Sequence, residues 1–211
     1  MKPPIAYPDK TLLLTPAYYG SVSRYAVMSR YGHVCIDTDG RFDKRFKTAH
    51  RMTVADVNGP IQLTLPVGKP ESLSRARWSD IALSSHGEWW HVHRVTLESA
   101  YGRTPFFEFY IDCFLPFMRR DTLDRFPTLT DLDMAIEHEV CDILGLPVPS
   151  AGNPPEDADR MIKTVSFDCR EVPYYQVRSS QFGFIPGLSI LDLIFNMGPE
   201  SQIVIRDMSL L

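Results

Sequence analysis

Apolar and aromatic residues recur at helical spacing between Ser85 and Gly102, in the stretch SHGEWWHVHRVTLESAYG. At 3.6 residues per turn, one face of this stretch carries Trp90, His93, Leu97 and Tyr101. Ser85 and Glu88 have the spacing of a capping box, which marks the start of a helix, and Gly102 suits its end. The pattern therefore predicts a helix over residues 86–101 with His93 on its buried face.

Four further segments have the apolar spacing of helices. A short one lies in PAYYGSVSRYAVMSRYG, residues 16–32, and aromatic residues at helical intervals predict another over residues 105–117. A well-marked apolar face predicts a helix over residues 128–144, on which Glu137–Glu139 are expected to face mostly water. The last is expected near Leu188–Phe195.

Apolar runs of strand length lie between these helices. The expected strands cover residues 11–15, 33–37, 61–67, 78–83, 164–167 and 174–177. Asn58–Pro60 reads NGP and predicts the turn of a hairpin. Residues 146–159, rich in proline and acidic residues, predict a long irregular connection. Together the elements predict one α+β domain over residues 1–211, a mixed sheet covered by three or four helices.

Composition and charge exclude some classes of function. Hydrophobic residues make up 44% and charged ones 23%, as in an ordinary folded protein. The net charge of −4 argues against nucleic acid as a partner, because phosphates need a basic surface. No apolar segment is long enough to cross a bilayer, and the N-terminus has no signal-peptide core. We therefore expect no membrane insertion and a cytoplasmic location.

The common motifs of cofactor, metal and nucleophile chemistry are missing from the sequence. The four cysteines form no CxxC pair, and no GxGxxG, Walker A loop or GxSxG elbow occurs. We therefore predict no metal site and no cofactor. Cys35 is either a nucleophile paired with a histidine or, as for most buried cysteines, a structural residue.

His93 is the first candidate for chemistry, because an imidazole on an apolar face must find a partner or stay neutral. It is either a hydrogen-bonded structural residue or a site residue. The basic run at residues 41–51 is either a phosphate or carboxylate site or a solvated surface. Asp192 and Asn196, four residues apart on the C-terminal helix, form either a polar recess or ordinary helix surface.

Several stretches resemble the WbqC-like protein family. PYYQVRSSQFGFIPGLSILDLIFNMGPES, residues 173–201, is similar to the family's ending, an aromatic-Gln segment, a GF-x-P turn and an LSI-x-D-L-x-FN-x-GP helix. WWHVHRVTLESAYGRTPFFEFY brings His93, Tyr101 and Pro105 into register with the family's pattern. RFDKRFKTAHRM followed by NGPIQLTLPV resembles the family's basic segment and the strand after it.

This resemblance implies a role in bacterial surface-polysaccharide and O-antigen biosynthesis, with transfer of an acyl or aminoacyl group to an amino-sugar nucleotide. In such a mechanism His93 is the general base, and Asp192 or Asp39 orients its imidazole. The residues expected to bind the small-molecule substrate are Lys44, Arg45, Arg51, Tyr101 and Asn196. One alternative is a non-catalytic module that binds a sugar or a partner of the same pathway. Another is a structural subunit that forms a homodimer.

Overall fold

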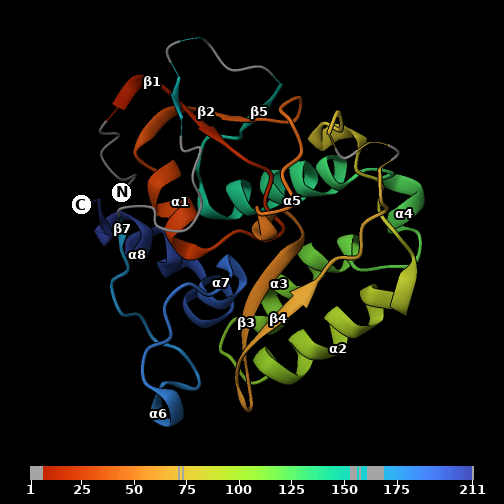
Figure 1. Ribbon diagram of the computed structural model, residues 1–211. Helices are drawn as coiled ribbons and strands as arrows, with labels where there is room; N and C mark the ends of the chain where they lie inside the picture. The colour runs from red at the N-terminus through yellow and green to blue at the C-terminus, as the bar shows by residue number, and fades with distance from the viewer. Residues whose placement is uncertain are drawn as a thin grey trace.

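A parallel sheet built around two neighbouring strands begins the fold (Figure 1). The computed structural model describes residues 7–70, 72, 74–152, 156, 158–160 and 169–210. β1 (Tyr7–Leu14) and β2 (Tyr31–Ile36) pair in parallel, and α1 (Val22–Met28) connects them. The short strands β5 (Ser150–Ala151) and β6 (Asp159–Arg160) extend the sheet in the order β5-β2-β1-β6. The first two predicted strands and the helix between them are confirmed, with shifted ends.

β3 (Arg51–Asp56) and β4 (Gly59–Thr64) form the antiparallel hairpin that the sequence predicts. Gly59 has a φ of +111°, a backbone conformation that other residues rarely adopt. Side chains alternate between the two faces of the hairpin, so that Leu63 is buried whereas Gln62 is exposed. The hairpin therefore presents polar side chains on the face opposite the core.

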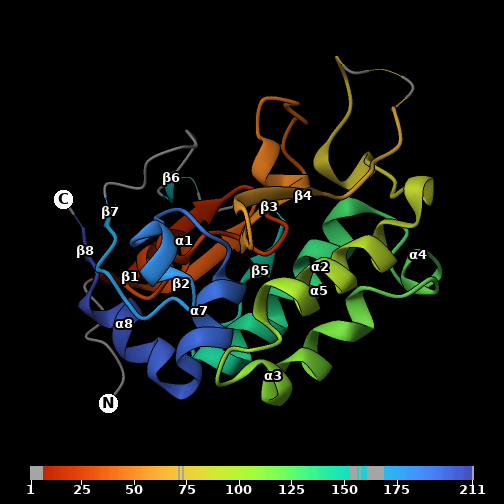
Figure 2. The same cartoon turned by 90° about the horizontal axis from the view of Figure 1, so that it is seen from below.

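α2 (Trp89–Tyr101) lies along the hairpin in both views (Figures 1 and 2). The predicted capping box is wrong, since the Ser85 side chain makes no capping hydrogen bond. Residues His86–Glu88 instead form a 3-10 turn, and Glu88 adopts the left-handed conformation with a φ of 44°. The chain kinks there, and the α-helix begins three residues later than expected.

The next helices fill the side of the molecule beyond α2 (Figure 2). α3 (Phe107–Phe114) continues as a 3-10 turn over Leu115–Phe117, so the predicted helix at 105–117 is confirmed in two parts. α4 (Thr122–Arg125) is a single turn that the pattern does not predict. α5 (Leu129–Leu144) agrees with its predicted bounds, and the Thr128 hydroxyl caps its first turn by accepting from a backbone N–H.

α5 also carries the clearest error in predicted burial. Glu137 is 1% exposed, whereas the sequence pattern placed it mostly in water. Arg24 of α1, itself 4% exposed, donates from Nε to Glu137 Oε1 at 2.8 Å. Asp133, one turn earlier on α5, is 1% exposed, and burial raises its pKa well above the usual carboxyl range. A buried polar cluster therefore joins α1 to α5.

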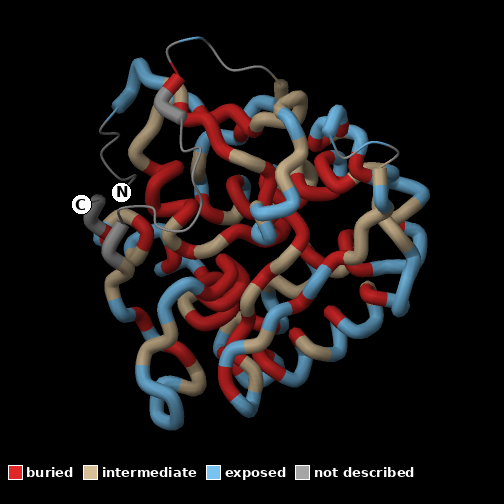
Figure 3. The backbone as a smooth tube through the Cα atoms, viewed as in Figure 1, coloured by how far each residue is buried: buried red, intermediate tan, exposed pale blue. Residues whose placement is uncertain are grey.

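The C-terminal part supplies the central helix of the core. α7 (Ile190–Met197) is buried at every position from Ile190 to Asn196, and the buried colour in Figure 3 concentrates around it. α6 (Ser179–Phe182) and α8 (Ser201–Asp207) flank α7 in sequence. The expected helix near Leu188–Phe195 is thus confirmed, while α6 and α8 are additions. β7 and β8, Cys169–Arg170 and Ser209–Leu210, pair antiparallel.

Two predicted strands are wrong, although the α+β class of a single compact domain is confirmed. Residues 78–83 contain a 3-10 turn, Trp78–Asp80, and residues 174–177 form no strand. The predicted strand at 164–167 lies outside the described residues. Parallel and antiparallel strands occupy separate small sheets. Among the helices that the structure describes, none combines the length and the apolar character that crossing a membrane requires.

Candidate functional site: a basic pocket and a histidine pocket

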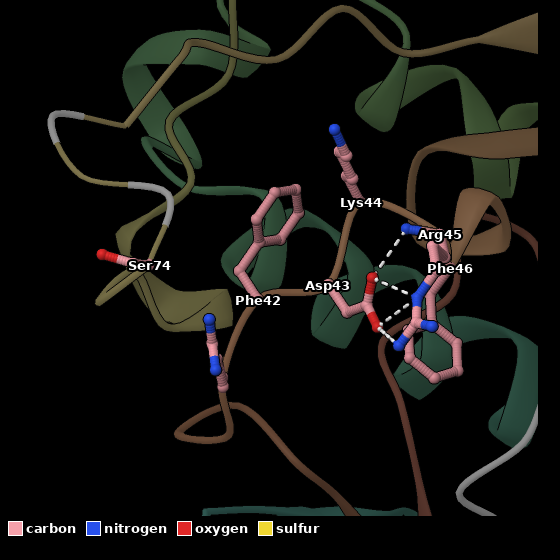
Figure 4. A pocket seen from close by; sticks show the side chains of 7 residues that line it. Phe42, Asp43, Lys44, Arg45, Phe46 and Ser74 are labelled. Atoms are coloured by element: carbon pink, nitrogen blue, oxygen red, sulfur yellow. Dashed lines mark hydrogen bonds and ion pairs between the residues drawn. The ribbon is translucent and has the colours of Figure 1, made fainter.

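The loop after β2 forms a pocket of about 620 Å³ that we call the basic pocket (Figure 4). Its lining consists of Arg41, Phe42, Asp43, Lys44, Arg45, Phe46 and Ser74. Lys44 extends away from the neighbouring ion pair, in which Arg45 Nε donates to Asp43 Oδ2 at 2.8 Å. That hydrogen bond holds the pKa of the Asp43 carboxyl at about 2. The lining combines three cationic side chains, one carboxylate and two aromatic rings.

Backbone hydrogen bonds and aromatic packing hold this loop in place. The Phe42 amide donates to the Ala76 carbonyl at 2.8 Å, and the Trp78 amide donates to the Gly40 carbonyl at 3.1 Å. The rings of Phe42 and Phe46 both contact buried Trp78 edge-on, with centroid distances of 5.0 and 6.2 Å. The apolar side of the loop is therefore anchored while its cations stay accessible.

A second pocket, of about 290 Å³, lies between β4 and the start of α2, and we call it the histidine pocket. Its lining includes Gln62 and Thr64 from β4, His86 from the 3-10 turn, and Trp89 and His93 from α2. The structure thus places His93, the first candidate from the sequence, at the edge of a pocket. The side chain itself is 2% exposed, as its position on the apolar face predicts.

Hydrogen bonds and ring packing hold the His93 side chain in place. The Tyr18 hydroxyl lies 2.9 Å from Nδ1 in a buried contact, and the Trp89 ring packs 5.5 Å away, centroid to centroid. Burial lowers the pKa of His93 to about 4, while a hydrogen bond with the Thr64 backbone acts in the opposite direction. The imidazole is therefore neutral at pH 7.

Acidification is expected to destabilise the protein through His93. Folding lowers the pKa of His93 from 6.5 to about 4, so between these values only the unfolded chain binds the proton. The free energy of unfolding should fall by about 3 kcal/mol more in the wild type than in His93→Gln as pH drops across this window. Urea unfolding of both proteins at pH values across that window measures the difference. Parallel stability curves would contradict the burial of a neutral imidazole.

The two pockets are connected through the hairpin. The 3-10 turn Lys47–His50 has four residues and connects the basic loop to β3. Such a turn rises only about 8 Å. Arg51, which follows it, pairs across the hairpin with Thr64 of the histidine pocket. The Nε of Arg51 is buried and has no hydrogen-bond partner among the described residues. Of the predicted binding residues, Arg51 thus neighbours the histidine pocket, whereas Lys44 and Arg45 line the basic one.

The other predicted site residues meet in a buried network around Asp192. The Tyr174 hydroxyl donates to Asp192 Oδ2 at 2.7 Å, and Gln176 Nε2 donates to the same oxygen at 3.1 Å. Burial raises the pKa of Asp192 to about 6, and hydrogen bonds from Tyr174, Tyr101 and Gln176 oppose that rise. Asn196 accepts from the Val177 amide and donates to the Asp192 carbonyl. These contacts fix the segment before α6 onto α7.

This network is separate from His93. Tyr101, which contacts Asp192, lies eight residues beyond His93 on α2, or about 12 Å along the helix axis. Tyr18 occupies Nδ1 of the imidazole, the position that an orienting carboxylate would take. Among the described residues, the Asp192 carboxylate accepts hydrogen bonds from Tyr174 and Gln176 and none from His93, so these contacts do not support its predicted orienting role. Asp39, the alternative, lies in the turn after β2, where the flanking Thr38 and Gly40 carbonyls accept hydrogen bonds from residues 79 and 78.

Cys35 has the environment of a structural thiol. It is 3% exposed, and burial raises its pKa above the ordinary thiol value, which disfavours the nucleophilic thiolate. Its Sγ contacts the Gly152 carbonyl at 3.5 Å. In the described part of the chain, no group of three or more His, Cys, Asp or Glu side chains could hold a metal ion.

Several residues of the pockets were not predicted from the sequence. Phe42 and Phe46 alternate with the basic residues, a pattern that could have suggested a pocket for an aromatic anion. Gln62 and Thr64 are ordinary polar positions of a half-buried strand, and Tyr18 fits a core stripe. Their roles depend on contacts between distant parts of the chain, which local periodicity does not contain.

The fold and the two pockets define an α+β protein with a basic pocket and a second pocket bordered by a buried imidazole. The profile of the WbqC-like protein family matches residues 33–154, more than half of the chain. The chain belongs to the WbqC-like protein family. The matched range contains both pockets and ends before residues 173–201, another stretch that carries the resemblance. No curated protein and no solved structure matches the chain.

Proposed function

We propose that this protein binds a nucleotide-activated amino sugar and transfers an acyl or aminoacyl group to it in bacterial surface-polysaccharide (O-antigen type) biosynthesis. The basic pocket is the observation that carries the proposal. Its volume of about 620 Å³ lies within the roughly 300–1,000 Å³ of small-molecule sites. Arg41, Lys44 and Arg45 suit a diphosphate, and the rings of Phe42 and Phe46 suit a base or sugar. Membership of the WbqC-like family supports the pathway.

The proposed reaction requires a base near the amine. The amine nitrogen attacks the carbonyl carbon of an activated acyl donor such as a thioester, the new N–C bond forms, and the C–S bond breaks. His93 is neutral at pH 7, so it accepts the proton that the amine loses and returns it to the leaving thiolate. A bound diphosphate nearby would favour the imidazolium and raise the low pKa of His93 toward neutrality. Reaction on a nucleotide-linked substrate also agrees with the predicted cytoplasmic location.

Removing two cations from the basic pocket is expected to weaken nucleotide-sugar binding at least tenfold. Each charge-assisted hydrogen bond contributes about 1.5–3 kcal/mol, so Lys44→Ala/Arg45→Ala loses more than the roughly 1.4 kcal/mol that a factor of ten requires. Isothermal titration calorimetry with UDP-, GDP- and dTDP-linked amino sugars measures the affinity of each variant.

Arg119→Ala/Arg120→Ala is the matched control, because it removes the same charge from another surface. Arg119 forms an ion pair with Asp121, two residues away in the sequence, and Arg45 likewise forms one with Asp43, two residues away. The control should bind the ligand within about twofold of the wild type, because its two arginines lie on another surface. Loss of their exposed ion pair should also cost the protein little stability. Equal weakening in both double variants would mean that net charge, and not the basic pocket, attracts the ligand.

The second candidate function is a non-catalytic module that binds the same nucleotide sugar. The surroundings of His93 favour it, because the Tyr18 hydroxyl contacts Nδ1 and the Thr64 backbone also hydrogen-bonds the ring. If Tyr18 donates its proton, neutral His93 carries its own proton on Nε2 and has no free lone pair for an amine. The homodimer expected for a structural subunit stays a prediction. Turnover measurements separate the two candidates.

A further inference from the structure

The histidine pocket differs in chemistry from the basic pocket. None of its described lining residues is Asp, Glu, Lys or Arg, and the polar groups come from Gln62, Thr64, His86 and His93. An amide and a hydroxyl each donate and accept hydrogen bonds without carrying charge. The side chains of Gln62 and Thr64 are exposed and make no hydrogen bond to another described residue. These groups are therefore available to an uncharged ligand.

The size of the histidine pocket restricts that ligand to a small group. Its volume of about 290 Å³ is at the lower limit for small-molecule sites, and it is less than half that of the basic pocket. A whole nucleotide suits the larger pocket, whereas a single sugar ring or an N-acyl group suits the smaller one. The turn Lys47–His50 rises about 8 Å from the basic loop to Arg51, which pairs with Thr64 of the histidine pocket, so one extended ligand is expected to reach both pockets.

The backbone beside the histidine pocket has an uncommon conformation. Gly87 has a φ of +73° and Glu88 a φ of 44°, and the second of these is uncommon for a residue with a side chain. Open space surrounds the position that a Cβ of Gly87 would occupy. His86 and Gly87, at this kink, are both part of the lining. Strain of this kind persists where the surrounding structure enforces it, and it concentrates at ligand sites.

We propose that the histidine pocket binds the sugar ring of a nucleotide sugar, and that Gln62 and Thr64 determine which sugar is accepted. This inference rests on the proposed function, because it assigns the diphosphate of the same ligand to the basic pocket. Hydroxyl and amide groups of the ring exchange hydrogen bonds with Gln62 and Thr64. The ring then lies against His93, where an amino substituent meets the imidazole.

The test compares a nucleotide sugar with its free nucleotide. Gln62→Ala/Thr64→Val should weaken binding of the nucleotide sugar about tenfold, because two hydrogen-bonding side chains are lost, and change that of the free nucleotide less than about twofold. Lys44→Ala/Arg45→Ala should weaken both. Thr53→Val is the matched control, because Thr53 pairs with Gln62 across the hairpin and does not line the pocket. Calorimetry with the UDP, GDP and dTDP series measures all four proteins.

The possible outcomes separate the inference from the proposed function. If the wild type binds a nucleotide and Gln62→Ala/Thr64→Val weakens both ligands equally or neither, the assignment of the sugar ring is wrong while the nucleotide site stands. If the wild type binds no member of the three series, the proposed function fails, and the assignment fails with it. Circular dichroism of each variant shows whether the hairpin has kept its fold.

Discussion

Replacing Arg24 with methionine is expected to lower the free energy of unfolding by about 3–5 kcal/mol, as loss of one partner from a buried ion pair does. Arg24 and Glu137 are 4% and 1% exposed, and Arg24 Nη2 lies 2.7 Å from Glu137 Oε1. Asp133 is buried beside them, with both carboxyl oxygens lacking a hydrogen-bond partner in the described residues. Without Arg24, the Glu137 carboxylate keeps its desolvation cost and loses its compensating cation. Equilibrium unfolding in urea measures the loss.

Two further variants identify the cause of this loss. Arg24→Met/Glu137→Leu removes both charges and should regain most of the stability, because a buried ion pair is often replaced by apolar residues at little cost. Arg94→Ala removes the exposed pair with Glu98, 3.8 Å apart, and should change stability by less than about 0.5 kcal/mol. If Arg24→Met unfolds within about 1 kcal/mol of the wild type, water reaches the cluster and the buried charge pair is not as isolated as described.

Replacing His93 with alanine is expected to lower acyl transfer at least about 10²-fold, because a positioned general base contributes about 10²–10⁴ to rate. The assay supplies acyl thioesters and the nucleotide amino sugars that bind, and mass spectrometry detects the acylated product. His91→Ala is the matched control, since His91 is an exposed histidine on the same helix. It should retain the wild-type rate.

The same assay decides between the two candidate functions. If His93→Ala folds and transfers at the wild-type rate, His93 is not the base. A wild type that binds the nucleotide sugar but transfers nothing from the thioesters supports the binding module. Tyr18→Phe adds a separate test, because it keeps the ring and removes the 2.9 Å contact with Nδ1. In an active enzyme it should alter the pH dependence of the rate, which a purely structural tyrosine would leave unchanged.

The sequence predicts those elements whose determinants are local. The hairpin follows from a turn motif between apolar runs, and α5 follows from its periodic face and its terminal Gly145, which has a φ of 64°. The apolar position of His93 is likewise local, and the structure buries it. The start of α2 was missed because residues 86–88 form a kinked turn, although Ser85 and Glu88 have capping-box spacing.

Contacts between distant segments account for most of the other errors. Glu137 flanks the apolar face of α5, and only the arrival of Arg24 from α1 determines that it is buried. Asp192 and His93 belong to different helices. Asp192 of α7 contacts Tyr101, at the end of α2, and this contact between distant segments cannot be predicted from either helix alone. The basic run could be recognised in the sequence, but the loop that closes its pocket contributes Ser74 from more than twenty-five residues away.

A crystal structure of the protein with a bound nucleotide amino sugar shows whether the two pockets hold the diphosphate and the sugar ring. We expect the diphosphate in the basic pocket, with phosphate oxygens about 3 Å from Lys44 Nζ and the Arg45 guanidinium. We expect the sugar ring beside Gln62 and His93. A diphosphate bound at another surface, with Lys44 and Arg45 in contact with solvent only, would contradict this expectation.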